Sequence, residues 1–273
     1  YVGGGTVSAG AWQEVRAFAK RLDAPVAASL MGQGVFDAHD PRFMGMLGMH
    51  GTKTSAEALR HCDLFVAVGT RFSDRVLCNA GLFAQHCPIL QIDIDAAEFN
   101  KYIDVDVRLE GDARAILQEL LEELPQQHHA EWLEEIHTWQ KTYPLHQTPP
   151  APGAVTPQKV LETLDRLTNS EAVVTTEVGQ HQMWTAQFYK FQRPRQLITS
   201  GGLGTMGFGL GAAMGAKLAC PDARVVNVAG DGSLHMNCNE LSTAAHYNVP
   251  VVELLFNNTV LGMVRQWQTL FYD

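Results

Sequence analysis

Two mostly apolar runs that each lead into polar, turn-forming residues constrain the fold of this chain more than any other feature. They are residues 225–229, followed by Gly230-Asp231-Gly232-Ser233, and residues 250–256, followed by Asn257-Asn258. A helix predicted between the two runs would make them neighbouring parallel strands. The carboxyl ends of such strands share one edge of the sheet, where open α/β sheets bind ligands. The sequence therefore predicts a ligand site that contains Asp231 and Asn258.

The residue types at this predicted edge suit a hard cation and a phosphate group. A carboxylate, an amide oxygen and a backbone carbonyl are ligands of Mg²⁺ or Ca²⁺, with phosphate oxygens and water completing the shell. Gly230 and Gly232 allow a sharp turn and a close approach of the backbone to a diphosphate. Asp, Gly and Asn are also common in ordinary turns, so either motif alone would indicate only a turn.

The whole chain predicts two α/β domains, at 1–148 and 149–273. Short apolar strands alternate with amphipathic helices, which is typical of a parallel sheet covered by crossover helices in three layers. A polar stretch that ends in Pro149-Pro150-Ala151-Pro152 is the predicted linker. The predicted strands are 25–29, 64–69, 89–94, 172–175, 223–229 and 250–256, and the predicted helices are 11–22, 55–61, 113–123, 129–143, 157–167, 207–218 and 239–247.

Composition excludes several classes of function. The formal net charge of -9 argues against nucleic-acid binding, which usually needs a basic face. No apolar run reaches the roughly eighteen residues that predict a membrane span. The five cysteines show no CxxC spacing, which predicts reduced thiols in a cytoplasmic protein rather than disulfides or a zinc site. The chain opens on Tyr1 and stops inside an amphipathic segment, so we expect it to be a piece of a longer protein.

Taken together, the two turns resemble the signature of enzymes that depend on thiamine diphosphate (ThDP). Asp231 and Asn258 are separated by the spacing typical of that signature (258 − 231 = 27). Two further strings, Val178-Gly179-Gln180-His181-Gln182-Met183-Trp184 and Leu261-Gly262-Met263-Val264-Arg265-Gln266-Trp267-Gln268, narrow the resemblance to the acetolactate synthase (acetohydroxyacid synthase) large subunit. The similarity extends over essentially the whole chain. It implies a central FAD/DHS-like domain, then a ThDP diphosphate-binding domain truncated at its C-terminus.

The resemblance assigns a role to each motif residue of the second half. Asp231, Asn258 and the carbonyl of Val260 would hold Mg²⁺. The carbonyl of Gly204 would accept from the 4′-amino group of the cofactor, and Met206 would wedge between its two rings. Met263 and Trp267 would line the pocket for the second substrate. The diphosphate would be contacted by Gly179, Gln180, His181, Gly232 and Ser233.

Residues 202–207 also form a literal GxGxxG, which is weak evidence for a dinucleotide-binding turn. No acidic residue ends a following strand, so we favour the ThDP interpretation of this loop. Outside the motif, Met206 would be interpreted as a plain core methionine.

The first half resembles the domain that binds FAD in the synthase, in a role that net redox chemistry does not require. One string that carries this resemblance is Gly69-Thr70-Arg71-Phe72-Ser73-Asp74-Arg75-Val76, and its Ser73 departs from the usual form of that string. Related enzymes keep this fold as a spacer without flavin. The residues that would contact flavin are Gly4, Gly5, Gly48, Met49, His50, Gly69, Arg71, Arg75, Asp93, Ile94, Gly111 and Asp112.

The function that the resemblance implies is decarboxylation of pyruvate on ThDP and transfer of the hydroxyethyl unit to pyruvate or 2-ketobutyrate. This reaction gives acetolactate or acetohydroxybutyrate for branched-chain amino-acid biosynthesis. A homodimer or tetramer formed through the ThDP cleft and a regulatory subunit are the implied partners. The alternatives are another ThDP carboligase, such as glyoxylate carboligase, a pyruvate oxidase, or a nucleotide- or ThDP-binding module without turnover. We expect the chain alone to be inactive, because the family draws an essential glutamate from a pyrimidine-binding domain.

Overall fold

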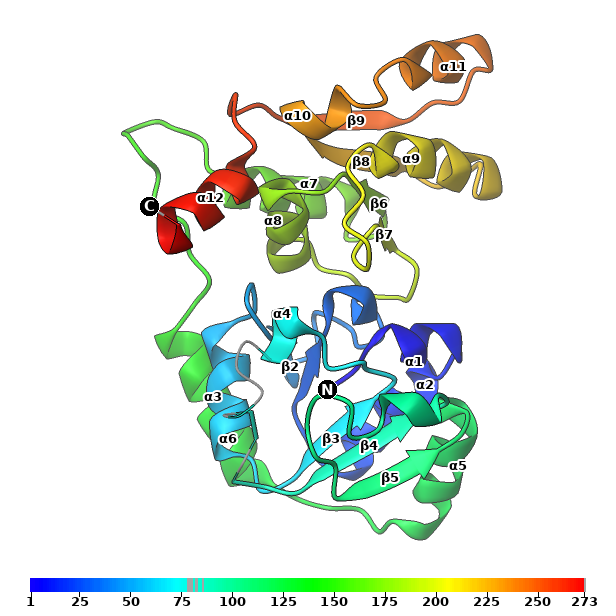
Figure 1. Cartoon of the computed structure of the whole chain (residues 1–273), viewed down its shortest axis with the longest axis vertical. Coiled ribbons are helices and arrows are strands. Elements are labelled where there is room, and N and C mark those ends of the chain that lie inside the picture. Colours follow the sequence, from blue (N-terminus) through cyan, green and yellow to red (C-terminus); the bar gives the residue numbers. More distant parts are fainter. Residues whose placement is uncertain (78–80, 82, 85, 273) are drawn as a thin grey trace. The chain divides into compact units, whose positions relative to one another are not determined.

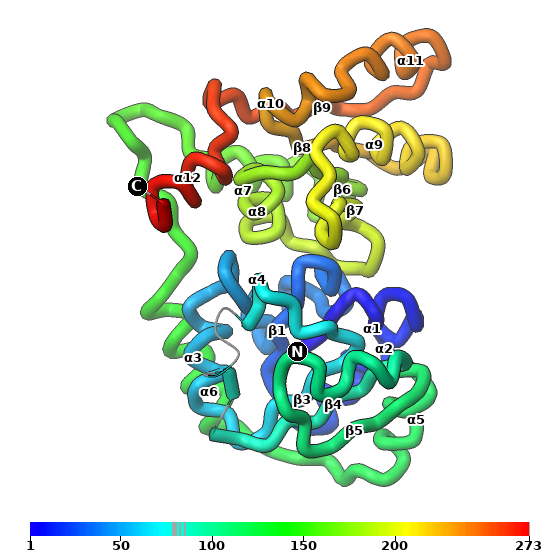
Figure 2. The backbone as a smooth tube through the Cα atoms, viewed as in Figure 1, coloured from blue at the N-terminus to red at the C-terminus, as the bar shows by residue number. Residues whose placement is uncertain are grey.

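The structure, a computed structural model, describes residues 1–77, 81, 83–84 and 86–272. These residues form two compact units, which Figures 1 and 2 show along the chain. Unit 1 comprises residues 1–145 with 192–194, and unit 2 comprises residues 146–191 with 195–273. The chain thus divides after residue 145, next to the predicted linker.

Unit 1 is built on a parallel sheet in which Val2 occupies the central position. Val2 forms parallel bridges with Ala28 on one side and Val68 on the other, so the spatial order is β2-β1-Val2-β3-β4-β5. Numbered along the chain from Val2, this order is 3-2-1-4-5-6, which is the strand order of dinucleotide-binding folds. The strands are β1 (Val26–Ala28), β2 (Phe43–Met46), β3 (Phe65–Val68), β4 (Ile89–Asp93) and β5 (Val107–Glu110).

Helices cover both faces of this sheet and enclose two apolar cores. One core, which includes Val15, Phe18 and Leu117, lies beneath α2 and α5. The other, which includes Phe65 and Ile136, lies beneath α3 and α6. Unit 1 is therefore a three-layer α/β unit. Its helices are α1 (Gly4–Ser8), α2 (Trp12–Arg21), α3 (Lys53–His61), α4 (Asp74–Leu77), α5 (Ala113–Glu123) and α6 (Ala130–Thr142).

Unit 2 contains a second parallel sheet, with spatial order β7-β6-β8-β9. Because parallel crossovers are right-handed, the helices that precede and follow β7 must cover opposite faces, which again gives three layers. The strands are β6 (Val173–Thr176), β7 (Leu197–Thr199), β8 (Val225–Gly230) and β9 (Val252–Phe256). The helices are α7 (Pro157–Thr168), α8 (Gln180–Phe188), α9 (Phe208–Ala219), α10 (Asp231–Leu234), α11 (Glu240–His246) and α12 (Gly262–Phe271).

The predicted α/β class and each predicted helix and strand are confirmed, with ends that differ by a few residues. The sequence did not predict β2, β5 and β7, which have three or four residues each, or the short helices α1, α4 and α10. Within the described residues, no helix has the length and apolarity that crossing a bilayer requires.

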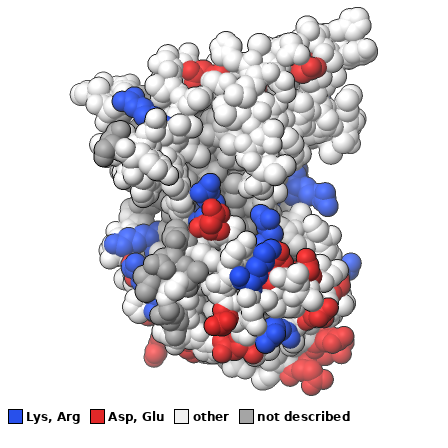
Figure 3. Space-filling model, in the orientation of Figure 1, with Lys and Arg blue, Asp and Glu red and all other residues white. Residues whose placement is uncertain are grey.

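The two units differ in their surfaces. Charged side chains of both signs are frequent on the face of unit 1 seen in Figure 3 and sparse on the face of unit 2. Unit 2 also exposes many large apolar side chains, among them Leu203, Tyr247, Val252, Leu270, Phe271 and Tyr272.

Candidate functional site

The order of the strands in unit 2 creates a ligand-binding position at the edge where β6 and β8 end. From β6 the chain crosses to β7 on one side and then returns to β8 on the other side. Such a reversal opens a crevice at the carboxyl ends of the two central strands. His181 follows β6 at the start of α8, and Asp231 follows β8 at the start of α10. The reversal therefore brings two predicted site residues to one crevice.

A pocket of about 240 Å³ lies at this edge, and most of the site residues predicted in unit 2 line it. Predicted residues that line it are Gly179, Gln180, His181, Gly204, Met206, Asp231, Gly232, Asn258, Val260 and Met263. These residues come from four separate segments of the sequence, so their convergence is a property of the fold.

The imidazole of His181 is buried beneath this pocket and carries no charge at neutral pH. Burial lowers its pKa to about 4, against the smaller opposing effects of a hydrogen bond to the Glu177 backbone and the charge of Asp231. Its Nε2 is buried without a hydrogen-bond partner among the described residues. A buried polar atom without a partner is costly, which indicates that a ligand group completes this site.

Two glycines make room for the His181 ring. A Cβ on Gly179 would lie 2.7 Å from Cε1 of His181, and a Cβ on Gly230 would lie 2.7 Å from Nδ1. Both distances are too short for any side chain. The glycines of the two turns thus hold the imidazole against the ends of β6 and β8.

The three predicted metal ligands reach the same pocket from β8 and from the turn after β9. Oδ1 of Asn258 accepts a hydrogen bond from the backbone N–H of Val260 (3.2 Å). Between them, Thr259 has a left-handed backbone (φ 59°), which gives the turn its shape. Asp231 offers a carboxylate, Asn258 an amide oxygen and Val260 a backbone carbonyl. This set of oxygen donors fits a hard cation such as Mg²⁺.

The loop that carries Gly204 and Met206 is anchored by Glu177, a residue to which the sequence analysis gave no role. Glu177 is fully buried just after β6. Its Oε2 accepts from the backbone N–H of Gly207 (2.6 Å), and its Oε1 accepts from those of Gly209 (2.9 Å) and Leu210 (3.2 Å). Burial raises its pKa, and these hydrogen bonds act in the opposite direction. The carboxylate therefore fixes the start of α9 to the sheet edge.

A second buried polar group crosses the sheet from β6 to β9. The side chain of Asn227 accepts from Thr175 Oγ1 (2.9 Å) and donates to Oε1 of Glu253 (2.8 Å). These residues are neighbours in the strand register. Burial raises the pKa of Glu253 to about 7. The network stiffens the three strands whose ends form the pocket.

Further pocket residues were not assigned a role from the sequence. The rings of Trp184 and Phe256 meet edge to face (5.6 Å between centroids) and form an apolar wall. The other such residues are Val178, Leu261, Gly262 and Val264. Trp184 is the last residue of the string at 178–184, and this position is the sequence signal that could have predicted the wall.

Two predicted residues of unit 2 lie outside the pocket lining. Ser233 is buried, and its hydroxyl donates to the carbonyl of Gly230 (3.2 Å). Trp267 is half-buried on α12, where its ring lies 4.8 Å from that of Phe271. Their contacts with cofactor and substrate stay predictions.

The residues predicted to contact flavin form two groups in unit 1. The first lies where Val2, β3, β4 and β5 end: Gly5 N–H donates to the Gly69 carbonyl (3.0 Å), and Gly111 N–H donates to that of Asp93 (2.9 Å). A Cβ on Gly5 would lie 2.8 Å from Cα of Gly69, so close packing alone requires this glycine. Gly4 lies in α1, Asp112 caps α5, and Ile94 is exposed.

The second group joins the loop at 48–51 to α4. The backbone N–H of Met49 donates to the carbonyl of Arg75 (2.8 Å), and a Cβ on Gly48 would lie 2.6 Å from that carbonyl. Burial and the charge of Arg75 lower the pKa of His50. Arg71 and Arg75 are both exposed. Flavin contact by either group stays a prediction.

Comparison with known proteins agrees with this geometry. Residues 177–273 match the family described as "Thiamine pyrophosphate enzyme, C-terminal TPP binding domain". Residues 1–120 match "Thiamine pyrophosphate enzyme, central domain". The pocket lies wholly within the first of these ranges.

Single relatives align along the whole chain. It is 44% identical to acetolactate synthase isozyme 3 large subunit of Escherichia coli, with 100% of this chain and 49% of the relative covered. It is 48% identical to the acetolactate synthase large subunit of Parasynechococcus marenigrum, with 100% and 44% covered. The chain thus spans about half the length of these relatives. It belongs to the thiamine pyrophosphate enzymes, and within them it is similar from end to end to acetolactate synthase large subunits.

Proposed function

We propose that the enzyme containing this chain decarboxylates pyruvate on ThDP and transfers the hydroxyethyl unit to a second 2-keto acid. The observation that carries the proposal is the convergence of Asp231, Asn258, Val260 and His181 on one pocket. The names of the relatives supply the reaction, since they are acetolactate synthase large subunits. The products would be acetolactate from two pyruvates and acetohydroxybutyrate from pyruvate with 2-ketobutyrate.

The residues of the pocket suit ThDP and Mg²⁺. Asp231, Asn258 and the Val260 carbonyl would hold the cation, which in turn would bind the diphosphate. The free N–H groups at the start of α8 favour an anion near Gln180. The chemistry that ThDP supplies when bound is a nucleophilic carbon and an electron sink for decarboxylation.

The chain itself orients the cofactor and keeps water away from it. Glu177 holds the loop of Gly204 and Met206, so that the Gly204 carbonyl is available to an amino group. Neutral His181 can make a hydrogen bond to the ligand without placing a buried charge beside it. Trp184 and Phe256 cover one side with apolar surface, which excludes solvent.

We also propose that unit 1 binds FAD. The strand order around Val2 and the contact of Gly5 with the end of β3 support a dinucleotide at that edge. The alternative is a spacer with the same fold and no flavin. Incubation with FAD followed by gel filtration separates the two. A flavin absorbance that stays with the protein supports binding, and a colourless protein supports the spacer.

Assembly and location belong to the same proposal. The exposed apolar side chains of unit 2, such as Leu270 and Phe271, favour a homodimer or tetramer through the ThDP cleft. The "large subunit" in the names of the relatives makes a regulatory subunit a natural partner. The cytoplasmic location expected from the cysteines stays a prediction.

Product analysis of the full-length enzyme tests the reaction. Incubated with pyruvate, ThDP and Mg²⁺, it is expected to form acetolactate, and added 2-ketobutyrate is expected to divert product to acetohydroxybutyrate. Condensation of glyoxylate, or oxidation of pyruvate without condensation, would instead assign the enzyme to the other ThDP reactions considered above.

A further inference from the structure

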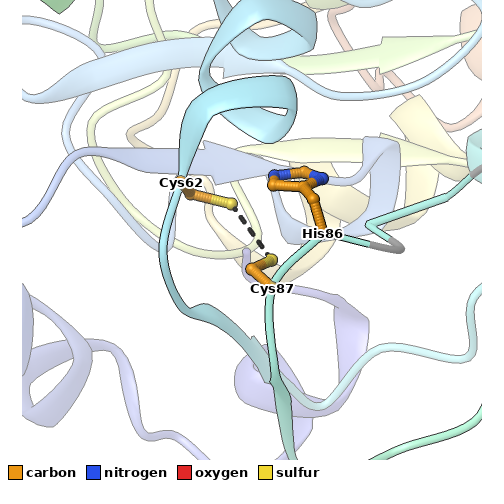
Figure 4. Close-up of side chains that lie close together, drawn as sticks. All are labelled: Cys62, His86 and Cys87. Carbon is orange, nitrogen blue, oxygen red and sulfur yellow. Dashed lines mark hydrogen bonds between the residues drawn. The ribbon is translucent and has the colours of Figure 1, made fainter.

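A cluster of metal-ligand side chains lies in unit 1, among residues that the proposed reaction does not use. It consists of Cys62, His86 and Cys87 (Figure 4). The two sulfur atoms lie 3.6 Å apart. The ligand atoms of all three residues lie within 4.8 Å of one another.

The fold places this cluster at the edge of the sheet opposite to the expected flavin contacts. Cys62 follows the last residue of α3, three residues before β3, and Cys87 stands two residues before β4. Because Phe65 pairs in parallel with Ile89, both cysteines lie at the amino ends of their strands. Gly69 and Asp93, in contrast, lie at the carboxyl ends.

The cysteine pair is built into the packing of the unit. Both side chains are half-buried and pack against the apolar core beneath α3 and α6. Cys62 Sγ also donates to the carbonyl of Leu59 (3.4 Å). The pair is separated by 25 residues in the sequence, so no local spacing motif predicted it. His86 is exposed beside the two sulfurs, which leaves solvent access to the cluster.

We propose that Cys62, His86 and Cys87 form a Zn²⁺ site, with solvent water as the fourth ligand. Two thiolate sulfurs and one imidazole nitrogen are the donor types that Zn²⁺ prefers. In a tetrahedral site with Zn–S bonds of about 2.3 Å, two sulfurs lie about 3.8 Å apart. The observed 3.6 Å is close to this separation. On binding, each cysteine releases its thiol proton to solvent, and the imidazole of His86 donates a lone pair.

A disulfide is the competing use of the same two cysteines. It requires a sulfur–sulfur distance of about 2.0 Å, far shorter than the distance in the structure. It also leaves His86 without a function. The geometry favours the metal.

A bound ion would connect the end of α3 to the segment that enters β4. Metal binding to such a preformed site adds its free energy to folding. The site would therefore stabilise unit 1 and leave the ThDP pocket unchanged.

Titration of the reduced, purified protein with Co²⁺ in excess Mg²⁺ tests the proposal, with Zn²⁺ as the competitor. Excess Mg²⁺ occupies the oxygen-ligand site, whereas a thiolate site gives Co²⁺ an intense sulfur-to-metal charge-transfer band. One equivalent of Co²⁺ is expected to produce the band, and one equivalent of Zn²⁺ is expected to remove it. Cys62→Ser and Cys87→Ser are each expected to weaken Zn²⁺ binding at least about tenfold.

Cys220→Ser and Cys238→Ser are the matched controls, since both cysteines are exposed in unit 2. They are expected to keep the band, and His86→Ala is expected to weaken it in a protein with unchanged circular dichroism. The proposal is overturned if no charge-transfer band forms, or if both Cys62→Ser and Cys87→Ser keep full affinity. The proposal would also be overturned if mass spectrometry finds a Cys62–Cys87 disulfide and the protein does not bind Zn²⁺ after this disulfide is reduced.

Discussion

Met263 and Trp267 lie one helical turn apart on α12 yet differ in their contacts. Met263 lines the pocket, whereas Trp267 packs on Phe271 and lies outside the lining. No residue of α12 is buried, so Trp267 is not a core residue whose loss would unfold the unit. The role of Trp267 at a site for the second 2-keto acid stays a prediction.

We predict that Trp267→Leu in the full-length enzyme lowers the preference for 2-ketobutyrate over pyruvate. The flat aromatic wall that favours the extra methyl group is lost, and discrimination of one methyl group amounts to roughly ten- to two-hundredfold. A competition assay with both acceptors measures the product ratio. Phe271→Leu, which removes the other ring of the pair, serves as the control. An unchanged ratio with a lower melting temperature in Trp267→Leu would show a packing role.

Among the elements, the start of α9 depends on one buried carboxylate. Both oxygens of Glu177 accept from backbone N–H groups, and a glutamine can offer only one accepting oxygen. Glu177→Gln therefore leaves at least one buried N–H without a partner, at a cost of about 1–3 kcal/mol. If the loop of Gly204 and Met206 moves so that this N–H group finds another acceptor, the loop no longer fits the cofactor. ThDP affinity should then fall by roughly 5- to 150-fold.

Calorimetry of ThDP binding, alongside a thermal melt, checks this role. A positioning role predicts weaker ThDP binding at a temperature where the variant is still folded. A fall in melting temperature with unchanged ThDP affinity would mean that Glu177 only stabilises the fold.

Because of Glu253, in the hydrogen-bond network across the strands, we predict that the stability of unit 2 depends on pH. The pKa of Glu253 is raised from 4.5 to about 7 in the folded state by burial. Between these values the folded protein binds more protons than the unfolded one, so stability contributed by this group falls as pH rises from about 4.5 to 7. Glu253→Gln keeps an acceptor for Asn227 and should flatten this part of the curve.

Urea denaturation of wild type and Glu253→Gln between pH 5 and 8 measures the effect, with Glu171→Gln as a surface control. The stability of the variant relative to wild type should increase with pH. A constant difference across the range would mean that Glu253 does not titrate there.

Sequence patterns predicted those elements whose signals are local. The strands before Asp231 and Asn258 are mostly apolar, each with one polar residue inside it, and were predicted. Helix α7 was predicted because Thr156 caps it ahead of Pro157. In contrast, β5 reads Val-Arg-Leu-Glu and β7 has three residues, too few for a period to show. The hydrogen bonds of Glu177 and the pairing of Cys62 with Cys87 join distant segments, which single-sequence patterns do not reveal.

At the scale of the whole molecule, the pocket offers binding groups but lacks the glutamate that the resemblance implies. None of the described residues that line it is a glutamate, and its one carboxylate, Asp231, is assigned to the cation. We therefore predict that the purified 273-residue chain forms no acetolactate from pyruvate with ThDP and Mg²⁺ present. The assay compares it with a no-protein control and with the full-length enzyme. Acetolactate above the no-protein level would require a base within this chain.

The most direct measurement is the affinity of the full-length enzyme for ThDP as a function of Mg²⁺, in wild type and in Asp231→Ala. Asp222→Ala, an exposed aspartate before β8, is the matched control. The wild type and Asp222→Ala should bind ThDP only when Mg²⁺ is present. Asp231→Ala should show no Mg²⁺-dependent binding, because the diphosphate loses its bridging cation. Unchanged ThDP affinity in Asp231→Ala would contradict the assignment of this pocket.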